Sequence, residues 1–334
     1  MRRIALFCLV FALGGAGGAL WHDWSRFIAS PILLGAEQVV FEIPRGTGVR
    51  ILARRLADQG LIDRPWYFFA LAYIRGASGR IKAGEYALEP GMNPLALLER
   101  FTSGRVVEYP ITLIEGWTFR QALAAIDAHT VFGNQGLATL SDAEIMERLG
   151  RPGVHPEGLF FPDTYLFPRH TSPLEILRRA LTRMDQLLAE EWDRRAPDLP
   201  LKTPYEALIL ASVIEKETGK SEERAQIAGV FVRRLRLGMR LQADPTVIYG
   251  LGARYDGKLR RADLRAPTAY NTYIISGLPP TPIALPGRAS IQAALHPAGG
   301  DTLYFVAKGD GSHVFSRTLD EHNRAVQYYA LDRP

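Results

Sequence analysis

The chain has 334 residues, of which 47% are hydrophobic and 22% are charged, and its formal net charge is +5. This composition is typical of a globular protein long enough for two or three domains, and it excludes a disordered or low-complexity chain. The single cysteine, Cys8, excludes an internal disulfide. No nucleic-acid recognition motif accompanies the positive charge, so we expect no nucleic-acid partner.

The N-terminus is a short basic segment followed by an apolar run. The run Ile4 to Trp21 contains no charged residue, and Arg2 and Arg3 precede it. This length is at the lower end of what spans the hydrocarbon core of a bilayer, and arginines before such a run favour a cytoplasmic N-terminus. We predict residues 1–3 in the cytoplasm, a single transmembrane helix at 4–21 and the rest of the chain outside. The alternative is a cleaved signal peptide, but no clear small-x-small site is followed by a mature-looking start.

After the anchor we expect a linker at 22–36 and a small α+β module at 37–114. Hydrophobic periodicity and turn residues predict the elements of this module. In chain order they are a strand at 38–43, a helix capped by Thr47 and ended by Gly60, a helix at 65–74, a strand at 84–88, a helix at 94–101 and a strand at 106–114.

The sequence of residues 115–334 predicts a larger, mainly helical domain. A proline- and aromatic-rich segment at 151–168 interrupts its helices. The elements expected after it are helices at 205–219 and 222–237, a turn through Asp244 and Pro245, an irregular segment at 277–287, a hairpin of 303–307 with 313–316, and a last helix begun by a Thr318–Glu321 capping box. The scattered arginines are interpreted as solvated helix faces; they are Arg178, Arg179, Arg183, Arg233, Arg234, Arg236 and Arg240.

The helix predicted at 205–219, YEALILASVIEKETG, carries two glutamates into different environments. At 100° per residue, Val213 and Ile214 lie on an apolar stripe and Glu217 falls near its centre, whereas Glu215 lies on the other side. Burial raises the pKa of a carboxyl group and keeps it protonated near neutral pH, as a general acid requires. The alternative is that Glu217 is only part of a fraying helix end before Gly219.

Several other chemistries are excluded by their missing motifs. The seven histidines lack metal-ligand spacing, and the chain contains no HExxH or GxSxG sequence and no phosphate loop of the form GxxxxGK followed by serine or threonine. We therefore expect no metal and no cofactor. What remains is one buried glutamate, the amides and hydroxyls of Gln242, Asn271 and Thr272, and many aromatic residues. This inventory is typical of an enzyme that acts on carbohydrate.

Six ordered motifs resemble the endolytic murein transglycosylase family, the YceG-like proteins. They are EGLFFPDTY at 157–165, ASVIEKETG at 211–219, RLRLGMRLQADPTVIYG at 234–250, YNTY at 270–273, GLPPTPI at 277–283 and FSRTLDEHN at 315–323. The resemblance extends from the anchor to the last helix. It implies an α+β fold with one transmembrane helix, a LysM-like module at 37–114 and a mixed α/β YceG-like catalytic domain at 115–334.

The resemblance also implies an activity and a location. Such a protein lies in the cell inner membrane with its catalytic part in the periplasm, near peptidoglycan synthases as partners. It cleaves the β-1,4 bond between N-acetylmuramic acid and N-acetylglucosamine within nascent peptidoglycan strands and leaves 1,6-anhydro ends. A muramidase that uses water, which would leave reducing ends, and a noncatalytic peptidoglycan binder are the alternatives. The products distinguish the two enzymes, and a Glu217→Gln variant distinguishes the binder.

The family's catalytic glutamate corresponds to Glu217 of EKET. The candidate substrate-binding residues are Glu157, Gln242, Thr246, Tyr249, Tyr270, Asn271, His322 and Asn323. Each has a structural alternative: Glu157 begins a turn and is suited to bonding backbone amides, and His322 and Asn323 lie on the last helix, where packing is an equal explanation. Asp244 precedes a proline and is interpreted as an Asx-turn residue.

Overall fold

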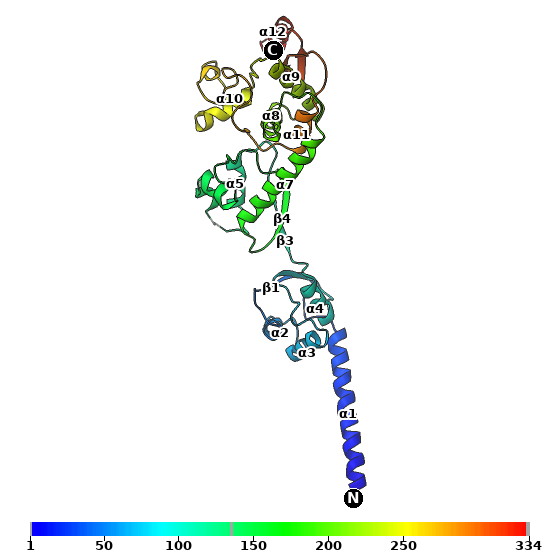
Figure 1. Cartoon of the computed structure of the whole chain (residues 1–334). Coiled ribbons are helices and arrows are strands. Elements are labelled where there is room, and N and C mark those ends of the chain that lie inside the picture. Colours follow the sequence, from blue (N-terminus) through cyan, green and yellow to red (C-terminus); the bar gives the residue numbers. More distant parts are fainter. Residues whose placement is uncertain (1, 134–135, 332–334) are drawn as a thin grey trace. The chain divides into compact units, whose positions relative to one another are not determined.

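The structure, a computed structural model, describes residues 2–133 and 136–331 in two compact units (Figure 1). Unit 1 comprises 1–109 with 166–170, and unit 2 comprises 110–165 with 171–334. The division between the units falls within β3 (Glu108–Thr112), which pairs with β4 (Thr164–Pro168). A short segment from the second half of the sequence therefore completes unit 1.

Unit 1 begins with α1 (Arg2–Ala29), whose last turns are part of its core. Phe27 is buried, and the rings of Trp24 and Tyr67 meet edge to face at a centroid distance of 5.5 Å. The Tyr67 hydroxyl donates a hydrogen bond of 2.9 Å to Asp23. Residues 22–29, predicted as the start of a linker, are therefore helical and packed.

The predicted anchor at 4–21 lies largely outside the residues whose side chains are described, which begin within α1 at Gly14. In the part of the chain that the structure describes, no helix has the length and apolar character needed to cross a membrane. The backbone of α1 is helical from Arg2 to Ala29 without a break.

A two-stranded antiparallel sheet forms one side of the unit 1 core. Phe41 of β1 lies opposite Tyr86 of β2, and the Tyr86 ring meets Phe101 edge to face at 5.0 Å. Alternating residues of both strands point inward onto three helices. The elements are β1 (Val39–Ile43), α2 (Val49–Asp58), α3 (Pro65–Ile74), β2 (Gly84–Leu88) and α4 (Pro94–Ser103).

The predicted bounds of α3 and β2 are confirmed, because proline and glycine mark their starts. The predicted cap of α2 is wrong. Gly48 is the N-cap residue, while the Thr47 hydroxyl donates to the Pro44 carbonyl at 2.7 Å in the preceding turn. A threonine can satisfy its hydroxyl locally in either place, so sequence alone does not fix the first residue of the helix.

Unit 2 is built around α8 (Pro204–Glu217), in which every residue from Ala207 to Ile214 is buried. Helices α7, α9, α10 and α11 pack against it or against one another around it (Figure 1). The remaining α-helices are α5 (Phe119–Asp127), α6 (Asp142–Arg148), α7 (Pro173–Asp193), α9 (Arg224–Arg236), α10 (Asp244–Leu251), α11 (Arg288–Leu295) and α12 (Leu319–Val326). Short helical turns are η1 (Leu137–Thr139), η2 (Ser221–Glu223), η3 (Gly252–Arg254), η4 (Asp263–Arg265) and η5 (Gln327–Leu331).

The C-terminal predictions are confirmed. β5 (Tyr304–Ala307) and β6 (His313–Ser316) form an antiparallel hairpin. Thr318 and Glu321 make both hydrogen bonds of a capping box at the start of α12.

The turn predicted at Asp244 and Pro245 is instead the start of α10, because proline is tolerated in the first helical turn.

The interpretation of the arginines as solvated is wrong for Arg233 and Arg234 of α9. Arg233 donates to the backbone carbonyls of Ala298 and Thr302. Arg234 is 6% exposed, and its guanidinium lies 4.9 Å from the centre of the Tyr304 ring. Its acceptors are the carbonyls of Leu303, Arg240 and Leu241 and the side-chain oxygen of Gln242. A planar guanidinium can be buried where several carbonyls converge on it, which local periodicity does not reveal.

The first prediction concerns the unit 1 core. Phe101→Ala removes a fully buried ring and should lower the free energy of unfolding by about 3–5 kcal/mol. Ile51→Ala, on α2, is the control because Ile51 is 58% exposed, and it should change stability by about 0.5 kcal/mol or less. Chemical denaturation measures both, and equal losses in the two variants would contradict the core described here.

Candidate active site

α8 carries Glu217 as its last residue. The helix begins at Pro204, where the Thr203 side chain accepts a hydrogen bond from the Glu206 amide, and it ends where Thr218 turns to an extended conformation. Because the preceding turns are buried on all sides, the helix passes through the unit 2 core and presents its last turn at the surface. The predicted helix at 205–219 is thus confirmed, two residues shorter at its end.

Burial raises the pKa of the Glu217 carboxyl to about 8, and the negative charge of Asp244 adds to the shift. Glu217 as a whole residue is partly exposed, whereas its carboxyl group is desolvated by the surrounding protein. Within the described residues, no donor forms a hydrogen bond with this carboxyl. Glu217 is therefore protonated at neutral pH and free to donate its proton to a ligand.

Asp244 and Tyr273 lie close enough to Glu217 to interact with it electrostatically. Asp244 is the first residue of α10, and it accepts a hydrogen bond of 2.6 Å from the Tyr273 hydroxyl. Burial raises the pKa of Tyr273, and its bond to Asp244 and the charges of Asp244 and Glu217 raise it further. The interpretation of Asp244 as a turn residue missed this pairing. The only signal in the sequence was its place in the motif QADPT, and Tyr273 lies in the separate motif YNTY.

Three of the candidate polar residues shape the backbone around this group. Gln242 has a left-handed φ of 52°, its amide donates to the Thr272 carbonyl at 3.1 Å, and its side-chain oxygen accepts from Arg234. Thr246 is fully buried and shares a hydrogen bond of 2.8 Å with the Thr272 hydroxyl. These bonds fix the start of α10 against the YNTY segment.

Asn271 is fully buried inside the same segment. Its side-chain nitrogen donates to the carbonyls of Leu264 and Ala266, and its side-chain oxygen accepts from the Tyr273 amide at 3.0 Å. All of these partners belong to the protein. Asn271, like Thr246, therefore supports the site from behind and offers no exposed group to a ligand.

A second acidic group is formed by Glu157, Tyr249 and Tyr270. Glu157 is 4% exposed and accepts hydrogen bonds from the Phe119 amide at 2.8 Å and the Tyr249 hydroxyl at 3.0 Å. Burial raises its pKa to about 7, against the opposing effect of these donors. The Tyr249 and Tyr270 rings meet edge to face at 4.8 Å. Glu157, at the start of one motif, thus bonds Tyr249, near the end of another, and the alternative of a backbone-amide contact describes its bond to Phe119.

The last two candidates lie on α12. His322 stacks on Tyr304 with ring centroids 5.3 Å apart, and burial and the charge of Arg234 lower its pKa. Asn323 is exposed. In the described part of the chain, no contact links the Asn323 side chain to the Glu217 group. His322 is connected to that group only indirectly, through Arg234 and Gln242.

Glu215 has a different environment from Glu217. Its side chain is 7% exposed and accepts hydrogen bonds from the Gly287 amide at 3.0 Å and the Ser290 hydroxyl at 2.7 Å, at the start of α11. Arg224 lies 3.9 Å away. A carboxylate at a helix N-terminus is stabilised by the unpaired amides there. Glu215 thus ties α8 to α11. It is buried like the turns before it, and it differs from Glu217 in its hydrogen-bond donors.

Gly287 lies against the Glu115 carboxyl group. A Cβ atom at Gly287 would displace the end of the exposed Glu115 side chain. Burial and the charge of Glu215 raise the pKa of Glu115, while Arg224 lowers it. No cluster of three or more histidine, cysteine or acidic side chains in the described part of the chain is placed to hold a metal ion. The desolvated carboxyl group of Glu217 is suited to proton transfer.

Comparisons with known proteins agree with this description. The model of the YceG-like family matches residues 41–328. An endolytic murein transglycosylase of Bacillus subtilis is 35% identical over 330 residues, which are 94% of this chain and 90% of that protein. One of Streptococcus pneumoniae serotype 2 is 28% identical over 96% of this chain, which spans only 64% of that protein's length. A crystal structure of a putative YceG-like protein from Listeria monocytogenes superposes with a TM-score of 0.57, at 30% identity, over 87% of this chain and all of that one.

A desolvated carboxyl group at the end of a core helix, in a mixed α+β domain, is typical of a site for general acid–base catalysis. The chain belongs to the YceG-like family, as the motifs predicted.

The second prediction tests the environment of Glu217 through pH. Its pKa is about 8 in the folded state and near 4.5 when unfolded, so the folded protein holds an extra proton between these values. The contribution of Glu217 to the free energy of unfolding therefore falls as pH rises from about 4.5 to about 8. The Glu217→Gln variant does not titrate at this position, so its stability does not fall for this reason. The Tm of Glu217→Gln minus that of the parent should increase with pH through this window and level off above it. A constant difference would contradict the raised pKa.

The third prediction concerns Glu215. Glu215→Ala leaves the Gly287 amide and the Ser290 hydroxyl without an acceptor and should cost about 1–3 kcal/mol in the free energy of unfolding. Ser290→Ala removes one donor only and should cost about 1 kcal/mol. Denaturant titration measures both variants. A Glu215→Ala protein as stable as the parent would refute the structural role.

Proposed function

We propose that this protein is an endolytic lytic transglycosylase. It cleaves the β-1,4 bond between N-acetylmuramic acid and N-acetylglucosamine within nascent peptidoglycan, forms 1,6-anhydro-muramic ends and so terminates glycan elongation. The observation that carries the proposal is Glu217, a desolvated carboxyl group with a pKa of about 8 at the end of a core helix, in a chain that matches endolytic murein transglycosylases along most of its length.

A single carboxyl group is sufficient for this reaction. Glu217 donates its proton to the glycosidic oxygen while the bond from that oxygen to C1 of the muramic residue breaks. The 6-hydroxyl of the same residue attacks C1, and its proton passes to the Glu217 carboxylate, which regenerates the acid. No water is consumed. Glycosidases that use water require a second carboxyl group, whereas an intramolecular hydroxyl gains a high effective concentration from its position.

Residues beside Glu217 and residues beside Glu157 assist in different ways. Asp244 places a negative charge near the developing oxocarbenium ion, and its bond to Tyr273 holds that charge in one position. Tyr249 and Tyr270, beside Glu157, offer aromatic faces suited to sugar rings. Gln242 is exposed beside Asp244 and is suited to bonding an acetamido group. Of the candidate residues, these are the ones we assign to substrate binding.

The N-terminal parts of the chain are the basis for our proposal of where in the cell the enzyme acts. We assign 4–21 as a single-pass anchor in the cell inner membrane, with 1–3 in the cytoplasm and the catalytic domain, 115–334, in the periplasm. The apolar run after two arginines supports this assignment. The module at 37–114 is proposed as LysM-like, supported by its small α+β core. Peptidoglycan synthases are the proposed partners, since the substrate is a strand under synthesis.

The fourth prediction tests the reaction. Purified peptidoglycan treated with the full chain in detergent should yield anhydro-muramic ends, and Glu217→Gln should reduce the rate by at least about 100-fold because an amide cannot donate the proton. Mass spectrometry of the products measures both. Glu222→Gln is the matched control, because Glu222 is exposed nearby on η2 and should retain the parent rate.

Other products would lead to other conclusions. Reducing muramic ends would identify a hydrolase that uses water, with Asp244 as the second carboxyl group. Equal anhydro product from the parent and from Glu217→Gln would remove Glu217 from the reaction. A cellular phenotype that Glu217→Gln fully rescues would favour the noncatalytic binder.

A further inference from the structure

The surface helix α3 of unit 1 is apolar on every side. None of its ten residues, PWYFFALAYI, is charged. A helix at a protein surface ordinarily carries polar residues on its outer face, and a helix that is apolar all round is ordinarily buried. In α3, Phe68, Leu71 and Ala72 are buried, and Tyr67 and Phe69 are partly buried against the core. The opposite face needs another explanation.

That outer face is an aromatic stripe. Trp66, Phe69, Ala70 and Tyr73 follow one another at helical spacing, and Ile74 adjoins them. Trp66 is 71% exposed, Tyr73 is 73% exposed, and the rings of Trp66 and Phe69 meet edge to face at 5.9 Å. Tryptophan and tyrosine in such a position are characteristic of the layer where lipid tails meet headgroups.

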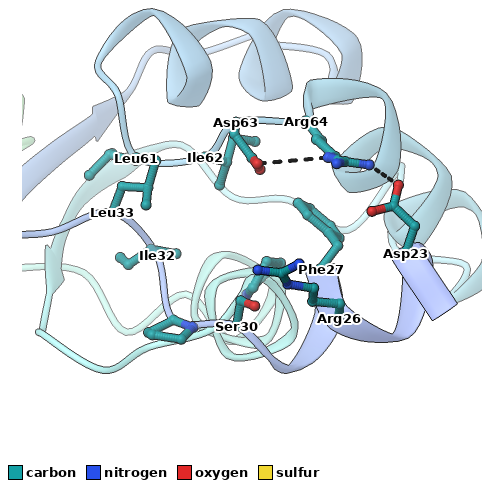
Figure 2. A pocket seen from close by; sticks show the side chains of 12 residues that line it. Asp23, Arg26, Phe27, Ser30, Ile32, Leu33, Leu61, Ile62, Asp63 and Arg64 are labelled. Carbon is teal, nitrogen blue, oxygen red and sulfur yellow. Dashed lines mark ion pairs between the residues drawn. The ribbon is translucent and has the colours of Figure 1, made fainter.

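Contacts with α1 place α3 at the level of that layer. Arg64, the residue before α3, forms an ion pair with Asp23 of α1 (Figure 2), and Tyr67 donates a hydrogen bond to the same carboxylate. Asp23 is two residues beyond Trp21, where the apolar run ends, which is about 3 Å along a helix axis. The headgroup layer is about 5–7 Å thick on each side of the hydrocarbon core. The start of α3 therefore lies within that layer if the run spans the membrane.

Positive charge surrounds the stripe. Arg50 and Arg54 of α2 line a shallow groove with Trp66 and Phe69, and the Arg50 guanidinium lies 5.4 Å from the centre of the Phe69 ring. Arg75 follows the last residue of α3. In Figure 1, α2 and α3 lie at the end of unit 1 from which α1 extends, and β1 lies farther from that end. Arginines at this level attract the phosphates of anionic lipids.

We propose that the outer face of α3 is a membrane-binding surface, in which Trp66, Tyr73 and Ile74 enter the headgroup boundary of the leaflet outside the cytoplasm. Arg50, Arg54 and Arg75 then contact lipid phosphates. The proposal rests on the proposed anchor at 4–21 and adds a second membrane contact to it. Aromatic residues also stack on sugars, but the level of α3 relative to the apolar run favours lipid over glycan.

The test uses the full chain in nanodiscs of phosphatidylethanolamine and phosphatidylglycerol. Cys8→Ser removes the native thiol, and single cysteines carrying a nitroxide label are introduced by Tyr73→Cys, Val40→Cys or Leu20→Cys. Val40 is the matched control because it is an exposed apolar residue of β1 in the same unit. The measured quantity is the ratio of collision rates with oxygen, which enters lipid, and with a nickel chelate, which stays in water.

The expected ratio at position 73 is several-fold higher than at position 40, and Trp66→Ser should lower it towards that of position 40. Trp66→Ser should leave the fold intact because the side chain is largely exposed. A high ratio at position 20 with equal low ratios at 73 and 40 would overturn the α3 proposal and leave the anchor standing. A low ratio at position 20 would refute the anchor itself. Immobilisation of the label at 73 by soluble peptidoglycan glycan, with no change on lipid, would identify a carbohydrate surface instead.

Discussion

The desolvation of one carboxyl group is the constraint around which unit 2 is arranged. Glu217 keeps its proton because α8 passes through the core and ends where protein surrounds the acid without offering it a donor. Other contacts hold that end in place: Ser212 accepts a hydrogen bond from the Ile283 amide, and Lys216 donates one to the Gly116 carbonyl. Each of them brings a distant part of the sequence to the last turns of α8.

Two glutamates separated by one residue show how strongly local surroundings determine chemistry. Glu215 has two donors and a nearby arginine, so it serves as an anion that organises the start of α11. Glu217 faces Asp244, whose charge opposes ionisation. The same side chain is thus a fixed structural charge in one position and a proton donor in the other, and the helical rotation between them separates the two roles.

The sequence was informative where the deciding forces are local. The helix α8, the hairpin of β5 and β6 and the capping box at Thr318 all follow from periodicity and short-range hydrogen bonds, whereas the predicted one-sided stripe of α8 is in fact burial on all sides. Contacts between residues far apart in the sequence could not be predicted from it. Glu157 bonds Tyr249 from 92 positions away, and Arg234 is buried by carbonyls that converge only in the folded chain. The pairing of Asp244 with Tyr273 belongs to the same class.

The short segment Leu166–His170 has a consequence for proteolysis. It belongs to unit 1 although the sequence on both sides of it belongs to unit 2, and within unit 1 Arg169 pairs with Glu85 at 2.5 Å. A protease that cuts once between residues 109 and 110 would sever the covalent link but leave this segment seated on its partner. Shedding the larger unit would require a second cut or local unfolding, so a single nick should produce two fragments that remain associated.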